Sequence, residues 1–256
     1  GRLKPTAVAK AIGPKTARSL EPYQFLEPPL ARVNGWVQTG PGRNPAALHF
    51  VIDGGAFRFS KFNTKDINAE IFWSGQTVTL TNIVAEFYGG ELHGNLVSRF
   101  NDDRSADLAF HIETKRTELT GLMSDILKKK SELSGRLDGV LDITANSKDM
   151  KSWNGSASVS LKEGYLWELP LIGIFAPVLD GLMPGLGAST FSEGTADFTI
   201  TDGVVGTRNL ELKSALIRLQ YKGKVDFDGR IHDAGVVAEA LRDTWGIGPG
   251  LGPLFN

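Results

Sequence analysis

The stretch from Leu161 to Ile200 decides the fold, and it reads LKEGYLWELPLIGIFAPVLDGLMPGLGASTFSEGTADFTI. Within it, an apolar run from Leu169 to Met183 carries Asp180 as its only charged residue. This run is shorter than the roughly 20 residues that cross a bilayer. As a helix it would be apolar on every side, so we expect it either to be buried against other elements or to contact a membrane. The residues that we expect to cap a sheet from this helix are Leu171, Ile174, Phe175, Val178 and Leu182.

Apolar and polar residues alternate on both sides of this run, with the period of a half-buried strand. The alternation is cleanest over Leu133–Ile143, Trp153–Leu161 and Ala215–Phe227. Near Asn82 the apolar residues slip from one face to the other. The strands are not separated by regularly spaced helices, so a parallel nucleotide-binding sheet is excluded.

Three other segments depart from this alternation. Between Thr114 and Lys130 apolar residues recur at helical spacing, which predicts an amphipathic helix. Pro5–Leu20 also has a helical pattern, and Val236–Trp245 reads as a short helix. We therefore predict a mainly β fold. It is a long antiparallel, twisted and curved sheet that forms a groove or a partly open barrel, with two or three short helices capping its apolar face.

The composition excludes several functional classes. The 256 residues carry a net charge of −1 without a long run of one sign, which argues against nucleic-acid binding. The chain has no cysteine, so disulfides, thiolate catalysis and cysteine-based zinc sites are excluded. Nucleophile-elbow, P-loop and dinucleotide-binding signatures are missing, and the four histidines lack metal-ligand spacing. We therefore predict that the protein is not an enzyme and holds neither a metal nor a cofactor.

A set of motifs in a fixed order resembles a known family. These motifs are Glu163-Gly164-Tyr165-Leu166, the apolar run, Phe191-Ser192-Glu193-Gly194, Phe198–Val204 and Gly223–Phe227. Together they resemble the C-terminal region of AsmA-like proteins, a bacterial envelope family related to TamB. The upstream segments Leu80-Thr81-Asn82 and Tyr88–Gly94 resemble an earlier repeat of the same family.

The resemblance implies a domain organisation and a location. Residues 1–30 would form an N-terminal helix and a proline-rich connector, and residues 31–256 one β-groove domain. Within that domain the earlier repeat would cover about 31–113 and the AsmA-like core about 114–256. Members of the family are anchored in the inner membrane of Gram-negative-type bacteria and project into the periplasm. This chain would then be the periplasmic part of a longer protein that is anchored by a segment outside it.

The resemblance also implies a function. The apolar groove would bind the acyl chains of phospholipids or other lipids and support phospholipid transport or outer-membrane assembly, with other envelope proteins as partners. No catalytic residues carry over from the family. The groove-face residues that we expect to contact lipid are Leu133, Leu137, Leu141, Ile143, Val159, Leu161, Phe198, Ile200, Ile217, Leu219, Tyr221 and Val225.

The alternation itself leaves other interpretations open. The same apolar residues could form the closed core of a structural or interaction domain that pairs with partners through its edge strands. A carbohydrate-active β-sandwich would need two carboxylates facing each other across a cleft. The five tryptophans are scattered over unrelated segments, which favours packing over sugar stacking.

Overall fold

The computed structural model describes Ala7, Lys10 and residues 23–37, 46–59, 61–166, 190–215, 217–228 and 230–241. Ala7 and Lys10 are helical, and the rest of the predicted N-terminal helix lies outside these residues. The apolar run from Leu169 to Met183 also lies outside them. The same holds for the five residues expected to cap the sheet, which are Leu171, Ile174, Phe175, Val178 and Leu182.

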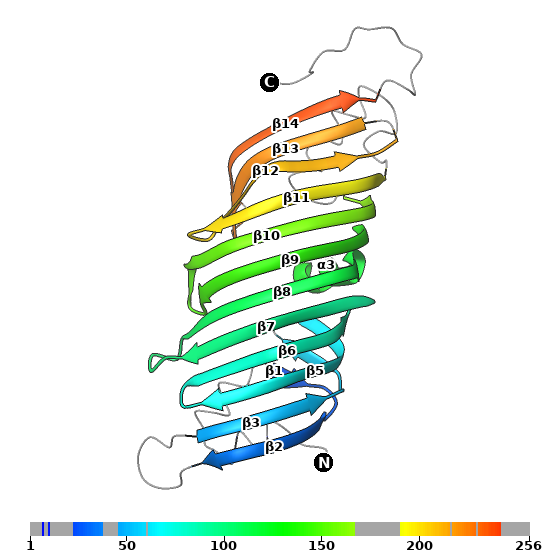
Figure 1. Cartoon of the computed structure of the whole chain (residues 1–256). Coiled ribbons are helices and arrows are strands. Elements are labelled where there is room, and N and C mark those ends of the chain that lie inside the picture. The colour runs from blue at the N-terminus through cyan, green and yellow to red at the C-terminus, as the bar shows by residue number, and fades with distance from the viewer. Residues whose placement is uncertain are drawn as a thin grey trace. The chain divides into compact units, whose positions relative to one another are not determined.

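The described residues form fourteen strands in one antiparallel sheet, which confirms the predicted mainly β fold (Figure 1). The hydrogen-bonded order is β1-β4-β5-β6-β7-β8-β9-β10-β11-β12-β13-β14, and β3 joins β2 to β5. The strands are β1 (Tyr23–Phe25), β2 (Leu30–Val37), β3 (Ala46–Asp53), β4 (Phe57–Phe59), β5 (Phe62–Ser74), β6 (Thr77–Phe87), β7 (Gly90–Phe100), β8 (Ala106–Glu118), β9 (Ser134–Asn146), β10 (Asp149–Tyr165), β11 (Phe191–Thr201), β12 (Val204–Lys213), β13 (Ile217–Asp226) and β14 (Ile231–Ala240).

Two predicted helices differ from the structure. Within the described residues one helix, α3 (Leu119–Leu127), interrupts the strands, and the segment before it, Thr114–Glu118, belongs to β8. β8 pairs with β7 through Lys115 and continues as a strand to Glu118, so the helix begins only at Leu119. α3 ends at Lys128, which adopts the left-handed conformation.

The predicted helix over Val236–Trp245 is wrong for its first half, because β14 continues through Ala240. Val236 is paired with Tyr221 and Ala238 with Leu219, so pairing with β13 decides the conformation. A short apolar run such as this one fits either conformation by its pattern alone. Among the described residues, no helix is long and apolar enough to cross a membrane.

The chain divides into two compact units. Unit 1 contains residues 1–115 and 141–152, and unit 2 contains residues 116–140 and 153–256. The predicted boundaries at residues 30 and 113 stay predictions.

The core of unit 1 lies at one end of its sheet. Ala31, Ile52 and Ile67 pack there with Phe57 of β4. The short strand β4 pairs with the first residues of β5 and β1 pairs with β4, whereas β3 pairs with the last residues of β5. The ring of Phe25 in β1 lies 5.0 Å from that of Phe57. β1 and β4 therefore close this end of the apolar face.

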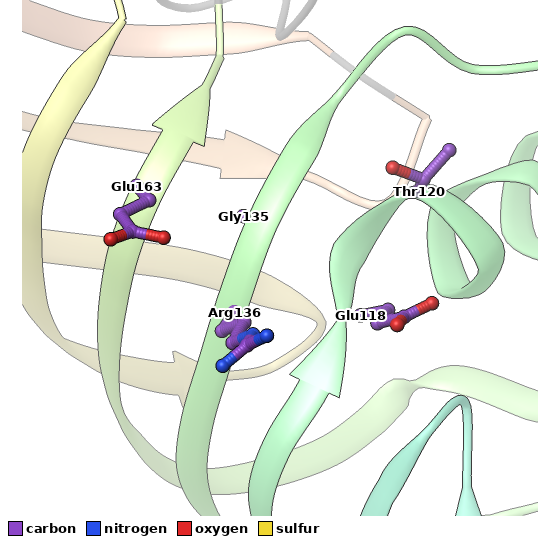
Figure 2. A pocket seen from close by; sticks show the side chains of 5 residues that line it. All are labelled: Glu118, Thr120, Gly135, Arg136 and Glu163. Carbon is purple, nitrogen blue, oxygen red and sulfur yellow. The ribbon is translucent and has the colours of Figure 1, made fainter.

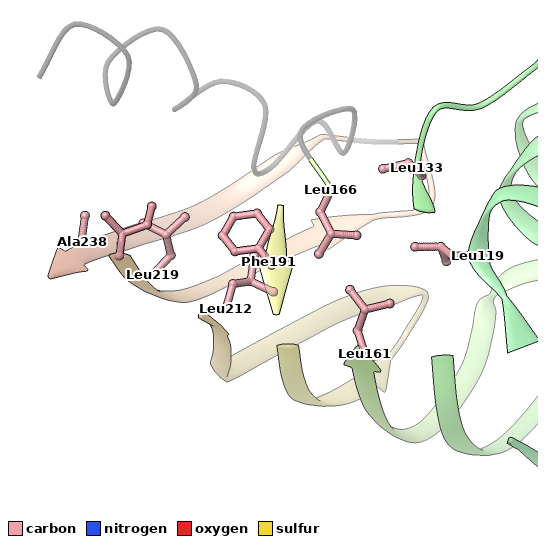
Figure 3. Packing of buried hydrophobic residues seen from close by; sticks show 9 residues of the cluster. Leu119, Leu133, Leu161, Leu166, Phe191, Leu212, Leu219 and Ala238 are labelled. Carbon is pink, nitrogen blue, oxygen red and sulfur yellow. The ribbon is translucent and has the colours of Figure 1, made fainter. Parts of the chain in front are cut away.

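The core of unit 2 is built around Phe191 and Leu133, both 0% exposed. Leu119 of α3 and Leu166 pack with them, as do apolar residues of β10 and β12–β14 (Figure 3). Figure 3 shows these side chains converging from segments that are far apart in sequence. The helix and the segments flanking the strands therefore cover one end of this apolar face.

Candidate functional site

A row of five large apolar side chains crosses unit 1 from strand to strand. The register pairs Phe50 with Ile71, Ile71 with Leu80, Leu80 with Leu96, and Leu96 with Phe110. Directly opposed residues of antiparallel strands lie on the same face, so the five side chains form one continuous row. All five are only partly buried. We call this row the unit 1 ladder.

A second row runs beside the ladder on the same face. It contains Leu48, Trp73, Val78, Ser98 and Leu108, which are opposed in that order. Ser98 is buried, whereas Trp73, Val78 and Leu108 are partly buried. The apolar surface around the ladder is therefore at least two rows wide.

The apolar face of unit 2 has a closed end and an open end. At the closed end, Leu161, Leu212 and Leu219 lie in one row and are all buried in the core. Farther along the strands burial is uneven: Ile200, opposite Val205, is 9% exposed, whereas Ile231 is 45% exposed. We call the open end the unit 2 patch, which comprises Phe198, Val205, Val225 and Ile231; the first three are partly buried.

The opposite face of unit 1 also exposes apolar residues, but they are isolated from one another. Val97 is opposed by Thr79 and Ala109, and Val84 lies opposite His93. Single exposed apolar residues are normal on protein surfaces, whereas contiguous ones indicate a binding surface. Contiguity therefore distinguishes the ladder from this opposite face.

The outer face of unit 2 is held by polar contacts. Glu211 accepts hydrogen bonds from Arg218 and Gln220 and lies 2.9 Å from the amine of Lys213. The contact with Lys213, followed by those from Arg218 and Gln220, lowers the pKa of the Glu211 carboxyl to about 2. This carboxylate therefore stays charged at neutral pH, and the outer face stays polar.

The predicted groove residues fall into two groups. Those that are buried, and so act as core, are Leu133, Ile143, Leu161, Ile200, Ile217, Leu219 and Tyr221. Those that are partly buried, and so present a surface, are Leu137, Leu141, Val159, Phe198 and Val225. Of the predicted groove residues, only the partly buried ones could therefore contact a ligand without a rearrangement of the core.

The unit 1 ladder was missing from the predicted site. Its signal was present in the sequence, since Phe50 and Phe110 both lie within alternating segments. The family resemblance drew attention to the second half of the chain instead. Only the strand register shows that the apolar positions of the first half adjoin one another.

A small polar hollow of about 250 Å³ lies in unit 2 where Gly135 of β9 adjoins β10 (Figure 2). Glu118, Arg136 and Glu163 line it, and all three are exposed to solvent. Figure 2 shows Arg136 between the two carboxylates. Exposed charges of both signs are typical of a solvated sheet surface.

Within the described part of the chain, no cluster of three or more histidine, aspartate or glutamate side chains could hold a metal ion. The chain was also compared with protein families, curated proteins and solved structures, and no match was found in any of the three.

Proposed function

We propose that this chain is a non-enzymatic lipid-handling protein that binds acyl chains on the apolar faces of its two units. The observation that carries the proposal is the unit 1 ladder, five large apolar side chains that adjoin one another and remain partly buried. Five adjacent strands span about 19 Å at ~4.8 Å per gap. That length and chemistry suit an extended hydrocarbon chain.

The energetics favour such a ligand. Each methylene group removed from water contributes about 0.8 kcal/mol, so a long acyl chain gains several kcal/mol even after its ordering cost. The structural core reaches near-complete burial, as Leu133 and Phe191 show at 0% exposure. The side chains of the ladder are less completely buried than those of the core, so part of their apolar surface is still exposed to solvent.

The motif order adds a cellular setting to the proposal. An AsmA-like protein would act in the periplasm, tethered to the inner membrane by a segment outside this chain. Its ligand would be a phospholipid or another acyl lipid, and it would support phospholipid transport or outer-membrane assembly together with other envelope proteins.

A charge placed on the ladder tests the proposal. Leu96 and Val97 are neighbours on β7 whose side chains lie on opposite faces. Purified protein would be mixed with vesicles containing a phospholipid with a fluorescent acyl chain, and protein-bound lipid would be measured. We expect Leu96→Glu to lower bound lipid by about tenfold or more, because the carboxylate would have to be desolvated.

Val97→Glu is the matched control, because Val97 is 39% exposed on the opposite face. It should bind lipid within about twofold of the wild type, since the new charge stays in water. Circular dichroism would establish that both variants fold. Wild-type protein that takes up no lipid, or equal loss in both variants, contradicts the proposal.

The exposed edge at β2 favours a second candidate function, an interaction domain that pairs with a partner strand. Within the described residues β2 pairs only with β3. It exposes Leu30, Val33 and Trp36 at 52%, 38% and 56%. Charged residues on an edge oppose strand addition. Leu30 and Trp36 lie on the face away from the ladder, opposite Asp53 and Ala47, so Leu30→Lys with Trp36→Lys should abolish a complex formed there. Lipid uptake would be unchanged.

A further inference from the structure

The hydroxyl group of Tyr221 is buried on the apolar face of unit 2 and has no hydrogen-bond partner among the residues that the structure describes. Tyr221 lies on β13 and is 5% exposed. Within the described residues its Oη makes no hydrogen bond. A buried donor without an acceptor costs free energy, and native proteins rarely leave one unpaired. The Tyr221 hydroxyl is therefore expected to donate a hydrogen bond to an acceptor.

The position of the ring shows where that acceptor would lie. A Cβ atom at Gly223 would lie only 2.2 Å from Oη and 2.6 Å from Cζ of Tyr221. The ring thus extends along β13 over Gly223, and the missing side chain of that glycine makes room for it. This direction leads away from Leu219 and Ile217 in the closed core.

The unit 2 patch begins at that point. Gly223 is opposed by Thr207 and Ala234, and the next row along the strands contains Val205, Val225 and Ile231. The hydroxyl of Thr207 contacts the side chain of Asn209, 3.4 Å away. The Tyr221 hydroxyl therefore lies where the closed core meets the partly open apolar surface.

The electrostatics select the kind of acceptor. Burial raises the pKa of Tyr221, and the negative charge of Asp233 raises it further. The hydroxyl is therefore neutral at physiological pH and able to donate. Because the hydroxyl is buried, a neutral acceptor is favoured over an anionic one such as a fatty-acid carboxylate, whose charge would have to be desolvated.

We infer that Tyr221 is a polar subsite that donates a hydrogen bond to the ester carbonyl oxygen of an acyl lipid whose hydrocarbon chain lies on the unit 2 patch. A neutral carbonyl at the base of an apolar chain matches a single donor at the edge of an apolar surface. The inference rests on the proposed function, and it adds a preference for ester-linked lipids.

The test compares two soluble short-chain phosphatidylcholines of equal chain length, one with ester linkages and one with ether linkages. Their equilibrium binding to the full chain would be measured below the micelle concentration. We expect the wild type to bind the ester lipid about tenfold more tightly, the effect of one buried hydrogen bond. Tyr221→Phe should bind both lipids equally, with the affinity of the wild type for the ether lipid.

Tyr165→Phe is the matched control, because Tyr165 is a partly buried residue that packs against the unit 2 core. It should keep the preference for the ester lipid. A wild type without that preference, or a Tyr221→Phe variant that retains it, overturns the inference while lipid binding stands. If the wild type binds neither lipid, the proposed function fails and the inference fails with it.

A soluble fatty acid of the same chain length separates the two carbonyl sources. It should bind wild type and Tyr221→Phe equally, because its carboxylate stays in water rather than being desolvated beside the buried hydroxyl. Loss of fatty-acid binding in Tyr221→Phe without loss of the ester preference would overturn the ester assignment.

Tyr221→Phe keeps the ring and should melt at or above the wild-type temperature. The ester–ether comparison on the wild type needs no variant at all.

Discussion

Individual residues inside the strands adopt conformations that bend the sheet. Asn82 and Arg116 have φ values of 53° and 57°, and Asn82 lies at the break in register between β6 and β7. The backbone N–H of Asn82 donates a hydrogen bond to Asn95 Oδ1 at 3.2 Å. The backbone N–H of Arg116 donates one to Asp138 Oδ1 at 2.7 Å. The bulge at Asn82 increases the local twist of the sheet. At both residues a side-chain oxygen satisfies the backbone amide group.

His111 predicts a pH dependence of stability. Its Nδ1 lies 2.7 Å from Asp142 and its Nε2 lies 3.2 Å from Glu113. The hydrogen bond to Asp142, followed by that to Glu113, raises the pKa of His111 above 6.5. Its stabilising contribution is therefore complete below pH ~6.5 and is lost as the pH rises through the higher folded-state pKa.

Urea unfolding of the wild type and His111→Gln at pH 6 and pH 9 would measure this effect. We expect the variant to be less stable at pH 6, with a smaller difference at pH 9. His93→Gln serves as a control, because His93 is 49% exposed and lies 4.0 Å from a single carboxylate. A difference between wild type and His111→Gln that does not change with pH would contradict the assignment.

Among the elements, the β9–β10 pair depends on close backbone approach at Gly135. This residue has φ +124°, and a Cβ there would lie 2.9 Å from Gly164 Cα and 3.0 Å from Lys162 O. Gly135→Ala should destabilise the protein by about 1–3 kcal/mol, because it adds both a strained conformation and a clash with backbone. Thermal unfolding would measure the loss.

Gly206→Ala in β12 is the control for that variant. Its added Cβ would meet only ordinary contacts at 3.4–3.8 Å. We expect a change in stability within about 0.5 kcal/mol. Equal effects of the two substitutions would show that the close approach at Gly135 is not required.

The helix α3 contributes through one side chain at its start. Leu119 is 8% exposed in the unit 2 core, whereas Leu127 at the other end is 42% exposed. Leu119→Ala should lower the free energy of unfolding by about 2–5 kcal/mol, because it leaves a cavity. Leu127→Ala should change it by less than about 0.5 kcal/mol. Denaturant titration of both variants would show whether α3 is held as described.

For the whole molecule, the alternation of apolar and polar residues was sufficient to predict an antiparallel sheet and the slip of face near Asn82. It was not sufficient to separate core from surface. Val159 and Leu161 occupy equivalent positions in the pattern, yet Leu161 is buried and Val159 only partly. What differs is their surroundings, because Leu161 packs with Leu166, directly after β10, and with Phe191 at the start of β11. The alternating pattern predicts which face of the sheet a residue lies on, but it does not predict how deeply the side chain is buried.

The most direct test of acyl-chain binding is photo-crosslinking from positions on opposite faces of the same strands. A benzophenone amino acid would replace Leu96 or Phe198 on the apolar faces, and Val97 or Thr199 on the outer faces. After irradiation with phospholipid vesicles, adducts would be identified by mass spectrometry. Acyl-chain binding on the apolar faces predicts phospholipid adducts at positions 96 and 198 and few at 97 and 199. Adducts that are missing at 96 and 198, or equal at all four positions, would contradict it.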